Sequence, residues 1–290
     1  MNYFKKIKTI FPALLLTMQW GTVHASTSHT SDMEFYLCIG QSNMAGRASI
    51  PSELTAKHLD NVWLFNQENK FEKASLPLNK YSNIRKDINM QGLGPSWSFA
   101  LQIVERNHKK PIGIVVNARG GSAIQQWEKG EPLYEKTLIR VQEALKKGKL
   151  KAILWHQGES NCDGKYLLSA SEYKKKLIEL VTNLRKDLGC DTLPIVIGQL
   201  GRWKWAKPAR IKEFNQMLSS LPAELPYTAC VSSEGLKAAY PGTSDPHFGT
   251  EAQLELGKRY AEAVIQLLHT STTHQAVTSV PSEKPSAYQK

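Results

Sequence analysis

Two side chains with the chemistry of a nucleophile and a base lie near opposite ends of this sequence. Ser42 sits in segment 40–46, which reads Gly-Gln-Ser-Asn-Met-Ala-Gly and directly follows an apolar run. A serine hydroxyl is a weak nucleophile until a base takes its proton, and backbone N–H groups at a turn into a helix can hold a developing oxyanion. Ser42 is therefore a candidate nucleophile and its N–H a candidate oxyanion donor, although the motif alone fits a helix N-cap serine better.

The candidate base is His247, in segment 244–249 (Ser-Asp-Pro-His-Phe-Gly) before the last predicted helix. Imidazole suits this role because its pKa lies near neutral pH, and a carboxylate can hold it in one tautomer. Among the eight histidines, His247 alone combines an adjacent acid with a turn before a helix. The rival base is His156, which we interpret as a strand-end residue that packs beside the site.

Two further polar segments follow apolar runs in the middle of the chain. Segment 117–122 (Asn-Ala-Arg-Gly-Gly-Ser) has adjacent glycines that suit a close approach to a ligand, so the Gly121 N–H is another candidate oxyanion donor. An ordinary β-to-α turn explains that segment equally well. Segment 155–161 (Trp-His-Gln-Gly-Glu-Ser-Asn) gives Gln157, whose amide could complete an oxyanion hole, and Glu159, which could orient a histidine or fix the loop.

In this order the four segments resemble those of the SGNH hydrolases, and more closely the sialate O-acetylesterase and acetyl xylan esterase group (carbohydrate esterase family six). The matching blocks are Gly-Gln-Ser-Asn-Met at 40–44, Gly-Gly at 120–121 with Trp127 after it, His-Gln-Gly-Glu at 156–159, His-Phe at 247–248, and Leu-Gly-x-Arg-Tyr-Ala at 256–261. The resemblance covers nearly all of the mature chain except the tail, and four blocks in order are far more specific than any one of them.

The resemblance implies an α/β fold, namely a flavodoxin-like three-layer α/β/α sandwich with a five-stranded parallel sheet. It implies that Ser42 is the nucleophile, that His247 is the base, and that the oxyanion donors are the N–H groups of Ser42 and Gly121 with the side chain of Gln157. It also implies a reaction without metal or organic cofactor, in which acetyl groups are removed from glycans such as xylan or sialic acids.

The acid that orients His247 departs from the family pattern. SGNH enzymes usually place the aspartate three residues before the histidine, where this chain has Ser244, and Asp245 is only two residues before it. We expect Asp245 to reach the imidazole through a tighter turn. Glu159 is the alternative acid, and a backbone carbonyl is a third possibility.

Candidate substrate contacts surround these segments. Indole faces stack on the CH surfaces of pyranose rings, so tryptophans near the site are candidate sugar platforms, with core packing as the alternative; for Trp205 we favour core packing. Arginines near the site could contact an acidic sugar, with salt bridges as the alternative. The candidate substrate-binding residues are Asn43, Arg119, Gly120, Trp127 and Trp203.

Alternating β-rich and helical runs must position these side chains. Strand-like runs occur at 35–39, 62–65, 112–116, 152–155, 195–197 and 228–231, and helical periodicity occurs at 96–106, 134–147, 171–188, 209–218 and 250–268. This alternation predicts a parallel sheet, whose sites form beyond the carboxyl ends of its strands. Residues 66–95 have weak periodicity and predict a long loop.

The two ends of the chain predict processing and disorder. Three lysines in residues 1–8, an apolar run at 10–18 and Val-His-Ala at 23–25 are typical of a secretory signal peptide (1–25) cleaved after Ala25. The apolar run is shorter than the ~18 residues that a membrane span needs. We therefore expect export to the periplasm or beyond without a membrane span, an esterase domain at 26–269, and a disordered tail at 270–290.

Charge and cysteine content narrow the function classes. The formal charge is +11, but the lysines are scattered along predicted helix faces, which argues against a nucleic-acid partner. Cys38 and Cys230 lie in strand-like runs and are expected to be free, whereas Cys162 and Cys190 lie in predicted loops and could pair; none has zinc-site spacing. The rival function is a non-catalytic carbohydrate-binding protein on the same fold, and the sequence does not predict an oligomeric state.

Overall fold

Seven strands form one sheet in the structure, a computed structural model that describes residues 33–278, with side chains through residue 270. The strand order is β3-β2-β4-β1-β5-β6-β7, and every neighbouring pair is parallel except β2 and β3. The strands are β1 (Met33–Gly40), β2 (His58–Phe65), β3 (Phe71–Ser75), β4 (Ile112–Ala118), β5 (Gly148–His156), β6 (Ile195–Gly198) and β7 (Thr228–Val231).

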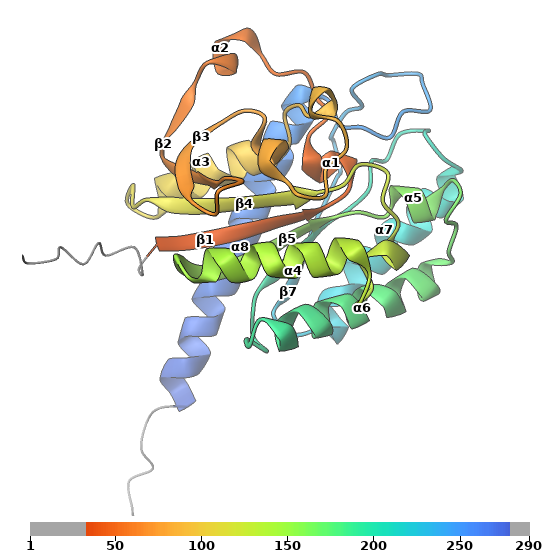
Figure 1. The fold of residues 1–290 in the computed structure, drawn as a ribbon. Helices are drawn as coiled ribbons and strands as arrows, with labels where there is room; N and C mark the ends of the chain where they lie inside the picture. Colours follow the sequence, from red (N-terminus) through yellow and green to blue (C-terminus); the bar gives the residue numbers. More distant parts are fainter. Residues whose placement is uncertain (1–32, 279–290) are drawn as a thin grey trace, which may run out of the picture.

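Helices cover both faces of this sheet (Figure 1). One face carries α4 (Pro132–Leu145), α6 (Ala170–Asp187) and α7 (Pro208–Glu224), and the other carries α3 (Ser96–Arg106) and α8 (Thr250–Thr278). The short elements lie in the connections and are α1 (Ser42–Ala45), α2 (Ser52–Thr55), α5 (Glu159–Cys162) and the 3₁₀ turns η1 (Leu78–Tyr81), η2 (Ile88–Met90) and η3 (Ile124–Trp127).

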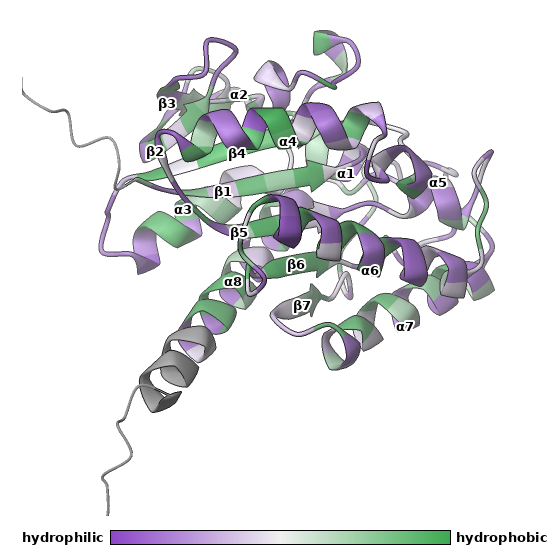
Figure 2. Cartoon of the chain, turned by 60° about the horizontal axis from the view of Figure 1, so that its bottom comes forward, coloured by the Kyte–Doolittle hydropathy of each residue, from purple (hydrophilic) through white to green (hydrophobic). Residues whose placement is uncertain are grey.

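The central strand β1 is apolar on both faces because helices bury both of them. Phe35, Leu37 and Ile39 face the layer of α4, α6 and α7, and Tyr36 and Cys38 face the layer of α3 and α8. Figure 2 shows the same pattern, since the inner strands are green while the helices carry purple outer faces. The two cores hold β1 rigidly, and β1 leads directly into the candidate nucleophile.

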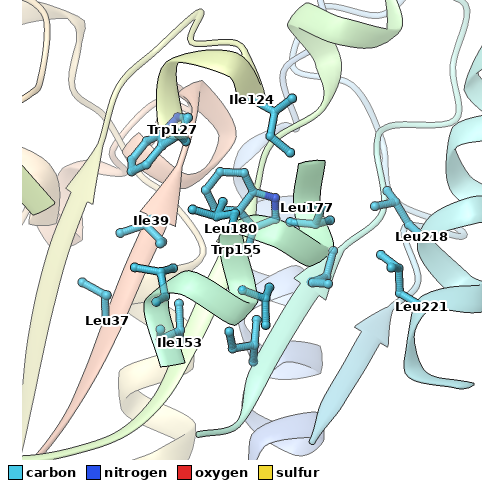
Figure 3. Close-up of a cluster of buried hydrophobic side chains, with 14 of the residues drawn as sticks. Leu37, Ile39, Ile124, Trp127, Ile153, Trp155, Leu177, Leu180, Leu218 and Leu221 are labelled. Carbon is cyan, nitrogen blue, oxygen red and sulfur yellow. The ribbon is translucent and has the colours of Figure 1, made fainter. Parts of the chain in front are cut away.

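Large aromatic side chains fill the first of these cores near the carboxyl ends of the strands (Figure 3). Trp127 and Trp155 pack edge to face with ring centroids 5.3 Å apart, and both are almost fully buried. Such pairs contribute about 0.5–1.5 kcal/mol beyond their buried area. The core therefore supports the floor beneath the loops that follow β4 and β5.

The predicted three-layer α/β/α class is confirmed, but the five-stranded sheet is wrong. All six strand-like runs of the sequence form strands, and β3 adds a seventh from within the segment 66–95 that we expected to be a loop. β3 is an antiparallel edge strand with few buried residues, so pairing with β2 and the packing of Phe71 on Phe35 and Phe65 stabilise it rather than a strong apolar pattern. Its short polar sequence gave no strand signal.

Two further expectations need correction. α8 continues to Thr278, past the expected start of the disordered tail at residue 270. Cys162 and Cys190 do not pair: Cys162 is buried within α5, Cys190 is exposed after α6, and both are free thiols, as are Cys38 and Cys230. The expected signal peptide (1–25) and residues 279–290 of the expected tail lie outside the described residues.

None of the helices in the described part of the chain combines the length and the apolar character needed to cross a bilayer.

We predict that Gly40→Ala destabilises the fold much more than Gly130→Ala. Both glycines have positive φ, 137° and 94° respectively, so each alanine adds backbone strain of about 1–3 kcal/mol. A Cβ on Gly40 would also lie 2.1 Å from the His156 carbonyl oxygen, whereas nothing lies within 4 Å of a Cβ on Gly130. Chemical denaturation should show a loss of more than about 4 kcal/mol for Gly40→Ala, and equal losses for the two variants would contradict this packing.

Candidate active site

One cavity of about 430 Å³ lies at the carboxyl ends of β1, β4 and β5 and is lined by residues that are far apart in the sequence. Ser42 and His247 both line it. This edge of the sheet follows from the parallel pairing, because β1 lies between β4 and β5 and the three strands end side by side. The lining residues are Gln41, Ser42, Arg47, Lys86, Met90, Gly120, Gly121, Glu159, Ser160, Asp163, Gly164, Trp205, Ser244, Pro246 and His247.

Ser42 is the first residue of α1 and is 5% exposed. β1 ends at Gly40, whose φ of 137° turns the chain, and the Gln41 N–H donates to the His156 carbonyl at 2.8 Å. The helix ends at Gly46, whose φ is 92°. The hydroxyl is therefore presented at the strand end by a turn that is anchored to β5.

His247 and Asp245 are in direct contact. Nδ1 of His247 lies 2.9 Å from Oδ1 and 3.1 Å from Oδ2 of Asp245. The same Oδ1 accepts the backbone N–H of His247 at 2.8 Å, so the carboxylate reaches the ring from only two residues away by closing a tight turn. Burial lowers the pKa of His247, the Asp245 carboxylate opposes that effect, and the Arg47 guanidinium adds to it. The imidazole is therefore neutral at neutral pH, as a base requires.

Gly120 and Gly121 line the cavity beside Ser42. The Arg119 N–H donates to the Gly40 carbonyl at 3.0 Å, which brings the loop after β4 against the end of β1. A Cβ on Gly120 would lie 2.2 Å from Nη2 of Arg47, and one on Gly121, whose φ is 71°, would lie 3.3 Å from Nζ of Lys86. The positive φ of Gly121 favours glycine there, and a side chain on Gly120 would displace the Arg47 guanidinium.

Glu159 and His156 are buried next to each other at the carboxyl end of β5, and Glu159 also lines the cavity. Burial raises the pKa of Glu159 to about 7 and lowers the pKa of His156 to about 3. Nδ1 of His156 lies 3.0 Å from the Tyr260 hydroxyl, and its Nε2 lies 3.7 Å from Glu159. His156 is thus a neutral packing residue, as we interpreted it. Glu159 contacts Asn43 at 2.5 Å rather than His247.

Gln157 is not placed where an oxyanion donor must be. It is fully buried, and its Nε2 lies within 3.0 Å of three protein oxygens, those of Gln41, Ser122 and Asn161. An amide nitrogen has only two hydrogens, so none is left for a substrate. The Gln157 amide, which we expected to complete the oxyanion hole, is therefore engaged by protein atoms in this structure.

Two of the expected substrate contacts are buried in the protein interior, and a third does not line the cavity. Asn43 is fully buried and bonded to protein atoms. Trp127 is 1% exposed and donates to the Ser122 hydroxyl at 3.0 Å. Arg119 donates to the Ile84 carbonyl at 2.9 Å and does not line the cavity. Asn43 and Trp127 satisfy their polar atoms inside the protein, and residue type alone does not reveal this.

Trp203 lies beside the site rather than in it. It lines a neighbouring cavity of about 500 Å³ with residues of α7 and the loop before it. Its Nε1 donates to the Asp245 carbonyl at 2.7 Å, and its ring packs edge to face on Phe248. Trp203 therefore supports the loop that carries the base.

Sequence reasoning missed Gln41, Lys86 and Met90, and it treated Trp205 as core packing. Trp205 is mostly buried and donates to the Gly201 carbonyl, but it also lines the cavity. Gln41 adjoins the candidate nucleophile, and that position is the signal that could have identified it. Lys86 and Met90 come from the segment with weak periodicity, which offered no signal.

No group of three or more His, Cys, Asp or Glu side chains suited to a metal ion occurs within residues 33–278.

Comparisons with known proteins identify relatives of this chain. A protein described as a probable carbohydrate esterase from Arabidopsis thaliana is 31% identical over 254 residues, which is 80% of this chain and 90% of that protein. The crystal structure of an Arabidopsis thaliana protein matches with a TM-score of 0.69 at 29% identity and covers 81% of this chain and 98% of its own.

Two more distant structures share the fold. NanS matches with a TM-score of 0.64 at 17% identity and covers 83% of this chain and 99% of its own. A carbohydrate acetylesterase from Xanthomonas citri matches with a TM-score of 0.57 at 20% identity and covers 81% of this chain and 57% of its own. The family model described as carbohydrate esterase, sialic acid-specific acetylesterase, matches residues 32–266. The chain therefore belongs to this carbohydrate esterase family, on an SGNH-hydrolase fold.

Proposed function

We propose that this protein is a serine esterase that removes acetyl groups from acetylated carbohydrates, with Ser42 as nucleophile, His247 as base and Asp245 as the acid that orients it. The observation that carries this proposal is the cavity that Ser42 shares with an imidazole whose Nδ1 is held by a carboxylate. The neutral imidazole leaves Nε2 free to accept a proton.

The reaction follows as two acyl-transfer steps. Ser42 Oγ attacks the acetyl carbonyl carbon while Nε2 of His247 takes the hydroxyl proton. The tetrahedral intermediate collapses, the bond to the sugar oxygen breaks, and the imidazolium protonates that oxygen. Water then attacks the acetyl-enzyme, again with His247 as base, and acetate leaves as Ser42 regains its proton.

The developing oxyanion rests on the N–H groups of Ser42 and Gly121, which belong to neighbouring loops of the cavity. We assign the third donor to Gln41 instead of Gln157. Gln41 lines the cavity, and its Oε1 accepts from Nε2 of Gln157 at 3.0 Å, which fixes the plane of its amide. Gln157 then acts as the support that holds Gln41 in place.

The cavity lining favours a small acyl group on a polar sugar. Trp205 and Met90 supply apolar surface for the acetyl methyl and the CH faces of a sugar. Arg47 and Lys86 supply positive charge, which favours a substrate with a carboxylate, such as an acetylated sialic acid, over neutral acetylated xylan. Acetate release from the two substrates measures this preference.

The pattern of residues 1–25 supports the further proposal that the protein acts after export, in the periplasm or outside the cell.

We predict that Ser42→Ala lowers the hydrolysis of p-nitrophenyl acetate by at least about 10⁴-fold, because the attacking oxygen is lost. Ser160→Ala is the matched control, since Ser160 lines the same cavity without a role in the reaction, and it should retain most of the activity. Both variants should keep the wild-type melting temperature. A Ser42→Ala enzyme with full activity would refute the nucleophile assignment. A wild-type protein that binds acetylated glycan without releasing acetate would favour the binding-protein alternative.

We predict that Asp245→Asn lowers kcat by about 10⁴-fold, because an amide stabilises the wrong imidazole tautomer and cannot balance the imidazolium charge. Glu159→Gln should change kcat little, since its remaining oxygen can still accept from Asn43. Steady-state kinetics on p-nitrophenyl acetate compare the two variants. The opposite ranking would make Glu159 the orienting acid.

We predict that kcat/KM falls on the acid side with a midpoint below pH 6.5, the ordinary value of histidine. The base must be neutral, and the folded protein lowers the pKa of His247, so the active form persists to lower pH. Arg47→Met should move this midpoint upward, because the guanidinium helps to lower that pKa. The distant Arg106→Met is the control. A midpoint above pH 6.5, or no shift in Arg47→Met, would contradict the assignment of His247.

A further inference from the structure

The side chain of Asn43 joins the loop of the nucleophile to the loop of the base. Its Nδ2 donates to the Pro246 carbonyl at 3.1 Å, and its Oδ1 accepts the Phe248 N–H at 3.1 Å. These two backbone groups flank His247 on both sides. Because Asn43 directly follows Ser42, its amide sets the height and tilt of the His247 backbone relative to the nucleophile.

Glu159 holds the Asn43 amide in this orientation. Its Oε1 accepts from Nδ2 of Asn43 at 2.5 Å, and both side chains are buried, at 3% and 0% exposure. A carboxyl group with so little access to water is costly without partners. The contact with Glu159 also prevents the Asn43 amide from rotating. A rotated amide would place its oxygen, an acceptor, against the Pro246 carbonyl in place of the Nδ2 donor.

A third element closes the network. Nε2 of Gln253, on α8, lies 3.3 Å from both the carbonyl and the Oδ1 of Asn43. The loops after β1 and β5 and the start of α8 are therefore connected through one amide. Since Asp245 already contacts the imidazole, Glu159 is not needed for that role, and its contact with Asn43 calls for a different explanation.

We propose that Asn43 and Glu159 are positioning residues: Glu159 orients the Asn43 amide, and Asn43 holds the backbone on both sides of His247 so that the imidazole meets the Ser42 hydroxyl. This proposal rests on the proposed esterase function. The effect of Asn43 is on kcat rather than on substrate binding, because Asn43 is fully buried and does not line the cavity.

The kinetic test is a double-mutant cycle on p-nitrophenyl acetate. Asn43→Ala should lower kcat about 100-fold with nearly unchanged KM, and Glu159→Ala should lower kcat about tenfold, since small misplacements of reacting groups cost rates of this size. Glu159→Gln should restore most of the activity lost in Glu159→Ala. Because Glu159 acts through Asn43, the double alanine variant should match Asn43→Ala alone. If the fold-loss of kcat in the double variant equals the product of the two single losses, Glu159 does not act through Asn43 and the proposal is overturned.

Asn215→Ala is the matched structural control. Asn215 also has a buried side-chain amide that binds backbone groups. It donates to the Leu200 carbonyl at 3.0 Å and accepts the Leu200 N–H at 2.8 Å. It should lose a similar amount of stability as Asn43→Ala and keep wild-type kcat. If Asn43→Ala and Asn215→Ala lose kcat in proportion to the stability that each loses, Asn43 has only a structural role.

A proton NMR experiment tests the positioning role without measuring catalysis. The low-field proton NMR signal of His247 Nδ1–H, assigned by its loss in His247→Ala, should be present in wild type, Asn215→Ala and Glu159→Gln. It should be broadened or shifted in Asn43→Ala, and in Glu159→Ala if Asn43→Ala does not fold. An unchanged signal in the folded variants would overturn the positioning role. A wild-type protein without esterase activity that passes this NMR test would instead overturn the proposed function.

Discussion

The parallel pairing of β1 with β4 on one side and β5 on the other is the constraint on which the site depends. It ends three strands at one edge, so that the loops after them must share a small volume. The pairing continues past the strands, since the Gln41 N–H donates to His156 and the Arg119 N–H donates to Gly40. The sheet therefore fixes the positions of Ser42 and Gly121. The proposed base, His247, comes from the loop before α8 instead.

The strands, the long helices and the two residues that we propose as nucleophile and base could be predicted because their signals are local. Apolar runs identified six strands, and the residue types in the four blocks identified Ser42 and His247 as partners before any geometry was known. The resemblance to a five-stranded family fold concealed β3, whose pairing partner rather than its own sequence makes it a strand. Lys86 and Met90 were missed for a related reason, because an irregular segment reaches the cavity only after it folds.

The errors about polar side chains have one physical source. Asn43 and Gln157 have the right chemistry to bind a substrate, but their hydrogen bonds are taken by protein atoms. A sequence shows which side chains can donate, and only the fold shows which of their hydrogens remain available. The predictions for the candidate sugar-stacking tryptophans differ from the structure for the same reason. Trp127 is buried in the core, and Trp205 lines the cavity.

The short spacing between Asp245 and His247 has a mechanical consequence. One carboxylate binds both the backbone N–H and the ring of His247, so acid and base form a small closed ring of bonds within three residues. Such a ring moves as one body. If a bulky glycan pushes this loop outward, the distance from the imidazole to Ser42 changes while the tautomer of the imidazole does not. The carboxylate therefore fixes the tautomer of the imidazole locally, whereas the distance from the imidazole to Ser42 depends on the contacts that hold the whole loop.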